Sequence, residues 1–139
     1  MKKIFLLLGF GLLAFGTVNA QNFARYIDGD STKTTAPYSI YREYFKKDLY
    51  NEALPFWKKI YENAPLFRQQ TFYDGAVIYT DVIQKTTNND DLRQKYIDTL
   101  FQIYKKQIAC HGESEYLLGK KAIDLLREVK ATIKVRLLY

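Results

Sequence analysis

The chain of 139 residues contains one cysteine, one histidine, three prolines and seven glycines. A single cysteine, Cys110, excludes an internal disulfide. Together with the single histidine, His111, it falls short of the four ligands of a structural zinc site. Glycine-rich phosphate loops and the short motifs of serine hydrolases and zinc peptidases are also missing from the sequence. We therefore expect no enzyme, no cofactor and no metal site.

The two residues best suited to chemistry are neighbours near the end of a predicted helix. An enzyme would have to depend on His111, with Cys110 beside it as an exposed thiolate. The simpler interpretation is a helix-terminal histidine that interacts with the carbonyl end of the helix. Cys110 itself is expected to be a partly buried small apolar side chain, and pairing with a cysteine of another molecule remains the alternative.

Charge gives little indication of a nucleic-acid partner. The chain has 21 basic and 15 acidic side chains, with a formal net charge of +6. Its lysine pairs, such as Lys46-Lys47 and Lys105-Lys106, are spread along the sequence instead of being concentrated on one face or arm. This pattern is typical of solvated helix faces, and we expect no nucleic-acid binding.

The N-terminal region has the three parts of a bacterial secretory signal peptide. Lys2-Lys3 precede an apolar run from Ile4 to Phe15, and small residues lead to Ala20. The apolar run is shorter than the ~20 residues of a membrane-spanning helix, and no cysteine follows that would carry a lipid anchor. Residues 1–20 are therefore predicted to be removed from an exported, periplasmic or secreted protein without stable membrane insertion; an uncleaved anchor is the alternative.

The remaining chain is predicted to be all-α. Residues 21–36 are polar and are expected to form a flexible segment. Apolar residues then recur at helical spacing in five stretches, and no alternating run long enough for a sheet interrupts them. Pro37 is expected in the first turn of the first helix, and Pro65 just after the second. The five stretches are approximately 37–47, 50–64, 68–85, 92–108 and 115–127.

Local signals mark the boundaries of the last two helices. Asp90 or Asp91 is expected to cap the fourth helix, Gly112 to end it in a left-handed conformation, and Ser114 to cap the fifth. Residues 129–139 mix β-branched and basic side chains, and their state is open. They form an irregular sixth helix, or they belong to an apolar edge that a partner or the rest of a longer repeat protein covers.

The chain also contains an internal repeat. Its first unit comprises Tyr41-Arg-Glu-Tyr44, Tyr50-Asn-Glu-Ala53, Trp57 and Pro65, and it resembles a tetratricopeptide repeat. The resemblance implies that Ala53 fills a small slot and Trp57 a large one, although Tyr41 occupies a slot that is usually small. When the repeat pattern is aligned again further along the chain, Ala76 and Gly119 fall at the position of Tyr41. The separation between Tyr41 and Ala76 is close to the tetratricopeptide period of ~34 residues.

This resemblance implies a domain over residues 37–128 in which antiparallel helical hairpins stack as a short α-solenoid. A generic up-and-down helical bundle is the alternative. In the family, two positions of each first helix line a concave groove that holds a peptide or a partner helix. Here the three units place six residues at those positions: Tyr38, Arg42, Tyr73, Val77, Tyr116 and Lys120.

A row of tyrosines with flanking cations suits an extended, acidic polypeptide, because each ring offers a rigid apolar face and a polar hydroxyl. The alternative is that these tyrosines, three of 12 in the chain, pack into the core. We expect a non-catalytic protein- or peptide-binding module in the bacterial cell envelope. A small assembly subunit that docks through its C-terminal edge is the second hypothesis, and the sequence leaves the oligomeric state open.

Overall fold

The computed structural model describes residues 22–137, and side chains as far as residue 128, so the predicted signal peptide and its cleavage site lie outside the described residues. The prediction of an all-α fold is confirmed, because this part of the chain consists of helices joined by turns and contains no strand beyond one isolated bridge. The helices are α1 (Ser31–Phe45), α2 (Tyr50–Asn63), α3 (Gln70–Lys85), α4 (Asp90–His111) and α5 (Glu115–Leu137).

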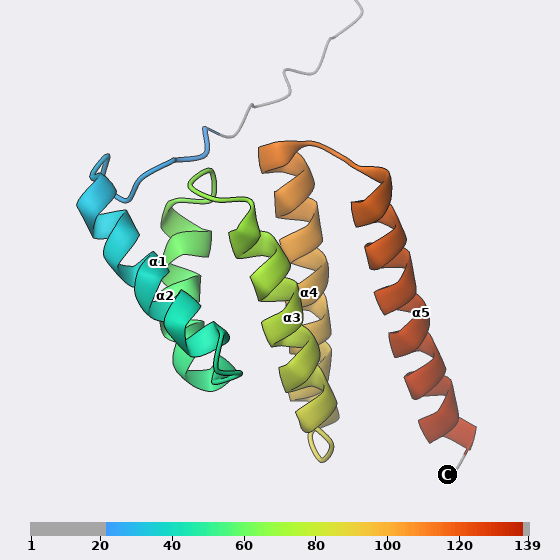
Figure 1. Cartoon of the computed structure of the whole chain (residues 1–139). Helices are drawn as coiled ribbons and strands as arrows, with labels where there is room; N and C mark the ends of the chain where they lie inside the picture. Colours follow the sequence, from blue (N-terminus) through green and yellow to red (C-terminus); the bar gives the residue numbers. More distant parts are fainter. Residues whose placement is uncertain (1–21, 138–139) are drawn as a thin grey trace, which may run out of the picture.

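The helices form two layers (Figure 1). Helices α1, α3 and α5 lie side by side in front, and α2 and α4 lie behind them. Each helix packs against the next one along the chain, most extensively within the pairs α1–α2 and α3–α4. The fold is therefore a series of helical hairpins, with α5 as a single helix beside the second pair.

The N-terminal part of α1 differs from the sequence-based expectation. The helix begins at Ser31, and Pro37 lies inside it instead of in its first turn. Asp30 caps the helix, because its Oδ1 atom accepts a hydrogen bond of 2.8 Å from the Thr32 N–H. Residues 31–36, expected to be flexible, are thus helical. The preceding segment is also held, since the buried Ile27 donates its N–H to Thr34 Oγ1 at 2.7 Å.

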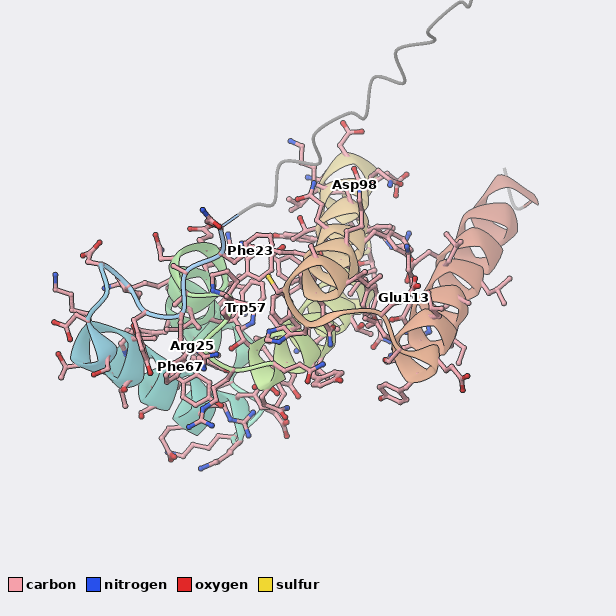
Figure 2. All side chains as sticks on the ribbon, turned by 90° about the horizontal axis from the view of Figure 1, so that it is seen from above. Phe23, Arg25, Trp57, Phe67, Asp98 and Glu113 are labelled. Carbon is pink, nitrogen blue, oxygen red and sulfur yellow. The ribbon has the colours of Figure 1, made fainter. Side chains whose placement is uncertain are left out.

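The two hairpins meet closely at Trp57, whose place in the interior is seen from above in Figure 2. Trp57 is 1% exposed, and its Nε1–H donates to the Thr71 carbonyl at 2.7 Å. A Cβ atom on Gly75 would lie 2.3 Å from Trp57 Cζ2, so only glycine fits beneath the indole. Ala53 and Trp57 are therefore buried, as expected. The small residue that lets the two hairpins approach closely is Gly75, whereas the repeat alignment placed the small residue at the neighbouring Ala76.

The boundaries of α4 and α5 agree in part with the sequence signals. Asn89, and not Asp90 or Asp91, caps α4, because its Oδ1 accepts from the Leu92 N–H at 2.9 Å. Gly112 ends α4 with a φ of 85°, and Ser114 Oγ accepts from the Leu117 N–H at 3.2 Å, as predicted.

The end of the described chain also departs from the expectation. Residues 129–137 continue α5, so they form no separate sixth helix. Gly119, expected in a tightly packed slot, is exposed, and a Cβ atom built on it would meet nothing within 4 Å. The predicted close contact of a neighbouring helix at Gly119 is therefore wrong within the described chain. The outer side of α5 is open at this point.

Candidate binding site

A groove runs between α3 and α5 and consists of two adjoining hollows of about 350 and 420 Å³. Val77 and Lys120 line both hollows, which makes the groove continuous. We call it the α3–α5 groove. The first hollow is lined by Gln70, Tyr73, Ala76, Val77, Tyr104, Tyr116, Leu117 and Lys120. The second is lined by Tyr50, Val77, Thr80, Asp81, Gln84, Lys120 and Arg127.

Four of the six predicted site residues line this groove. Tyr73 and Val77 come from α3, and Tyr116 and Lys120 come from α5. The two tyrosine rings are in edge-to-face contact at the groove, with centroids 6.2 Å apart and an interplanar angle of 65°. Tyr116 is 67% exposed and Tyr73 is partly buried, so neither ring belongs to the buried core. Val77, 43% exposed, adds an apolar surface between them.

The other two predicted residues, Tyr38 and Arg42, lie outside the α3–α5 groove. Tyr38 packs edge-on against the rings of Tyr41 and Phe67, at centroid distances of 5.1 and 5.2 Å. Arg42 forms an ion pair with Asp74 of α3. The expected row of three tyrosines is therefore incomplete, because Tyr38 belongs to an aromatic cluster at α1 and Arg42 is engaged in joining α1 to α3.

Asp74 is the centre of the polar contacts between α1 and α3. Its carboxylate is 2% exposed, and it accepts hydrogen bonds from Tyr41 Oη at 3.1 Å and Gln70 Nε2 at 2.8 Å in addition to the ion pair with Arg42. Burial, followed by the charge of Asp74, raises the pKa of Tyr41, so its hydroxyl stays protonated and donates. Gln70 also lines the groove, which connects this network to the candidate site.

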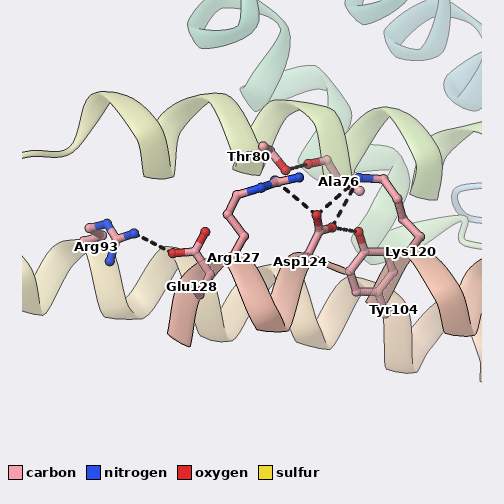
Figure 3. A network of polar contacts seen from close by, with 8 residues as sticks. All are labelled: Ala76, Thr80, Arg93, Tyr104, Lys120, Asp124, Arg127 and Glu128. Carbon is pink, nitrogen blue, oxygen red and sulfur yellow. Dashed lines mark hydrogen bonds and ion pairs between the residues drawn. The ribbon is translucent and has the colours of Figure 1, made fainter. Parts of the chain in front are cut away.

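A second buried carboxylate, Asp124, anchors the α5 side of the groove (Figure 3). Its side chain is fully buried and accepts hydrogen bonds from the Tyr104 hydroxyl of α4 and from Lys120 Nζ at 3.3 Å. It also forms an ion pair with an Arg127 guanidinium nitrogen at 3.1 Å. Burial is the main cause that raises the pKa of Tyr104, and the bond to Asp124 adds to it. Two cations thus face one carboxylate, which leaves a net positive charge along this wall.

A further ion pair holds α5 in place. Arg93 of α4 pairs with Glu128 of α5, whose side chain is 10% exposed. With Asp124, Glu128 fixes the rotation of α5 about its axis, and therefore fixes Tyr116 and Lys120 at the groove. Sequence reasoning missed these acids: the spacing of Lys120, Asp124 and Arg127 is compatible with helical ion pairs, but nothing local marks Asp124 as buried.

His111 and Cys110 lie away from the groove, at the end of α4. His111 Nε2 is 3.2 Å from the Pro65 carbonyl oxygen, and its ring packs edge-on against Phe72 at 5.4 Å. Cys110 is partly buried, and this burial raises the pKa of its thiol although Lys106 acts in the opposite direction. Within residues 22–128, no three cysteine, histidine or acidic side chains are arranged to hold a metal ion.

Comparison with known proteins adds no further residues to the site: no family model, curated protein or solved structure matches the chain. Across the described helices, none combines the length and the apolar character needed to cross a bilayer. The candidate site is therefore the α3–α5 groove, with an apolar lining of Ala76, Val77 and Leu117, two tyrosine rings in edge-to-face contact, and the cations Lys120 and Arg127.

Proposed function

We propose that the protein is a non-catalytic module that binds a protein segment or peptide in the α3–α5 groove. The observation that carries this proposal is the pair of Tyr73, partly buried on α3, and Tyr116, exposed on α5, in edge-to-face contact at the groove with Lys120 beside them. Solvent-exposed rings of this kind are typical of binding surfaces, because they contribute a large contact area at a small entropic cost. Equilibrium binding without covalent chemistry is the mechanism that these side chains support.

The groove suits a segment that combines an apolar side chain with an acidic one. The apolar side chain packs against Tyr73, Val77 and Tyr116, and the acidic one interacts with Lys120 and Arg127. Asp124 compensates only one of these two cations, and Asp81, which also lines the second hollow, is paired with Lys85. Charge complementarity of this type mainly increases the association rate and the specificity, so binding should weaken as salt is added.

The proposal also covers where the protein is located in the cell and how its helices are arranged. The signal-like segment 1–20 supports export to the bacterial periplasm or beyond the cell. The front layer of α1, α3 and α5 supports a tetratricopeptide-like solenoid, in which first helices line the concave side. In this solenoid the α3–α5 groove takes the place of the peptide groove, while the α1–α3 junction is closed by Asp74 and Arg42.

Selection from a displayed library of short random peptides tests the binding proposal. The purified protein is expected to enrich acidic peptides with apolar or aromatic residues, and a variant with Tyr73→Ala and Tyr116→Ala should bind them roughly 100-fold more weakly, since a hot-spot ring contributes about 1–2 kcal/mol. The control replaces Tyr26 and Tyr44, two partly buried rings outside the groove. Peptides that bind both double variants equally well would contradict groove binding.

A second candidate function is that of an assembly subunit that docks on a larger complex through its C-terminal edge. The specific observation in its favour is the exposure of Leu118, Leu125 and Leu126 on α5, at 43%, 49% and 60%. Substitution of Ala122, which lies among them, by glutamate should abolish docking through this edge and leave peptide binding in the groove intact. Docking that survives Ala122→Glu and is lost with Tyr73→Ala and Tyr116→Ala would favour the groove.

A further inference from the structure

Helix α5 is joined to the rest of the protein by few apolar contacts. Between residues 115 and 128, where its side chains are described, Leu117 is the single buried apolar residue, whereas α3 contributes five such residues and α4 four. The partly buried apolar side chains that surround this core come from α1 to α4 and from the loop after α2. The described part of α5 therefore gains less from the burial of apolar surface than α3 and α4 do.

The other buried side chains in this part of α5 are acids. Asp124 accepts a hydrogen bond from the Tyr104 hydroxyl, and Glu128 pairs with Arg93, so that both acids contact α4 (Figure 3). When α5 separates from α4, water solvates all four groups again, and the hydration regained largely offsets the attraction lost. These contacts therefore set the orientation of the packed helix but add little to the free energy of its packing.

The connection between α4 and α5 permits such a separation. Gly112 ends α4 with a φ of 85°, and α5 begins at Glu115. A Cβ atom built on Gly112 would meet nothing within 4 Å, and residues 113 and 114 are exposed. Since glycine also has access to a wide range of backbone conformations, residues 112–114 can serve as a hinge.

The α3–α5 groove depends on the position of α5. Tyr116 contacts Tyr73 of α3 edge-to-face, and Leu117 and Lys120 line the first hollow together with residues of α3. When α5 moves away from α4, these two walls separate, and a bound segment loses the contacts of one wall. A ligand that contacts both helices therefore binds much more tightly when α5 is packed in place.

From these contacts we infer that α5 opens and closes as one unit about residues 112–114, and that a peptide bound in the groove stabilises the closed state. The second part of the inference rests on the proposed function, whereas the first needs no ligand. An isolated helix of the length of α5, 23 residues, is only marginally stable in water. Opening therefore also exposes its backbone amides to hydrogen exchange, and the binding of a partner orders the C-terminal helix.

Opening of α5 should be frequent in comparison with unfolding of the whole chain. Burial of one leucine side chain favours the closed state by roughly 10- to 150-fold. Global unfolding of a small domain is opposed by a factor of about 1,000 or more. We therefore expect the amides of residues 119–126 to exchange at least about 10-fold faster than the slowest amides of α3.

Hydrogen exchange measured residue by residue in nuclear magnetic resonance spectra tests the opening, on protein purified from a bacterial host that expresses the full chain. The amides of residues 119–126 should share one protection factor, because one motion exposes them all. Exchange of these amides as slow as in α3 would overturn the inference, because α5 would then open only when the whole chain unfolds. A gradient of protection that falls steadily toward residue 126 would also overturn it, because it indicates fraying of the helix end.

Arg93→Gln tests whether the opening involves the whole helix. Neither Arg93 nor Glu128 lines the groove, and the substitution leaves the Glu128 carboxylate without this partner when α5 is closed. All amides of residues 119–126 should then exchange at least about 10-fold faster. Lys95→Gln, the same loss of charge at an exposed position of α4, should leave these rates unchanged. Acceleration confined to the amides next to Glu128 would contradict opening as a unit.

A peptide selected from the displayed library tests the stabilisation of the closed state. At a free concentration of about 100 times its Kd, the amides of residues 119–126 should exchange roughly 100-fold more slowly. At the same concentration the variant with Tyr73→Ala and Tyr116→Ala should show a decrease of only about 2-fold, because it binds roughly 100-fold more weakly.

The outcomes separate this inference from the proposed function. A peptide that binds in the groove without slowing the exchange of α5 would overturn the stabilisation of the closed state and leave the proposed function in place. If the library yields no peptide, the proposed function fails and the stabilisation by a ligand fails with it. The opening of α5 is then still decided by the exchange rates of the parent protein and of Arg93→Gln.

Discussion

Replacement of Gly75 by alanine should destabilise the protein, although alanine is the better helix former. A Cβ atom at this position would lie 2.3 Å from Cζ2 and 2.7 Å from Cε2 of Trp57. Carbon atoms in contact are normally about 3.5–4.0 Å apart, so α3 or the indole has to move. Trp57 is 1% exposed and bonded to the Thr71 carbonyl, which leaves it little freedom to do so.

The expected magnitude follows from three contributions. Inserting a methyl group into a packed core costs about 1–3 kcal/mol. Displacing the indole from its hydrogen bond to Thr71 costs about 1 kcal/mol more. The higher helix propensity of alanine returns about 1 kcal/mol. The free energy of unfolding of Gly75→Ala should therefore decrease by about 1–3 kcal/mol.

Gly119→Ala is the matched control, because it is the same change inside a helix with no atom within 4 Å of the new Cβ. It should increase the free energy of unfolding by about 0.5–1 kcal/mol. Urea unfolding is followed by far-ultraviolet circular dichroism. A Gly75→Ala variant as stable as Gly119→Ala would refute the close packing of Trp57 on α3.

Three further substitutions test other parts of the fold. Gly112→Ala should lower the free energy of unfolding by about 1–3 kcal/mol, because its φ of 85° and ψ of 168° strain any other residue; thermal unfolding measures this loss. Asp124→Asn should cost about 2 kcal/mol, since it removes the charge that Tyr104, Lys120 and Arg127 share; urea unfolding measures it. Hydrogen bonds from Thr32 lower the pKa of Asp30 below its ordinary value of 3.8, so its stabilisation is complete above that pH and is lost as the pH falls through the lowered pKa. The melting temperature of the parent should then decrease more than that of Asp30→Asn between about pH 5 and pH 3; equal decreases would contradict the cap.

The helices could be predicted where the signal is local. Helical periodicity located α3 and α4, and the glycine at 112 with the serine at 114 located the turn between α4 and α5. The start of α1 was missed, because its first turns carry few apolar residues and the Asp28-Gly29 turn before them has the composition of a loop. Its stability depends instead on the Asp30 cap and on the contact between Thr34 and Ile27.

The candidate site could be predicted only in part for a related reason. The repeat alignment identified Tyr73 and Tyr116, which the fold brings together on α3 and α5. It failed for Tyr38, because the aromatic neighbour Phe67 comes from the loop after α2, which the alignment does not describe. Asp124 could not be recognised as buried from the sequence, since its burial depends on Tyr104 of another helix.

Titration of the protein with a library-selected peptide, followed by methyl resonances in nuclear magnetic resonance spectra, tests groove binding most directly. Val77 and Leu117 line the α3–α5 groove, whereas Leu125 and Leu126 lie exposed on α5 outside it. The account predicts saturable shifts of the Val77 and Leu117 methyl groups and unchanged resonances of Leu125 and Leu126. Shifts confined to Leu125 and Leu126, or to α1 and α2, would contradict it.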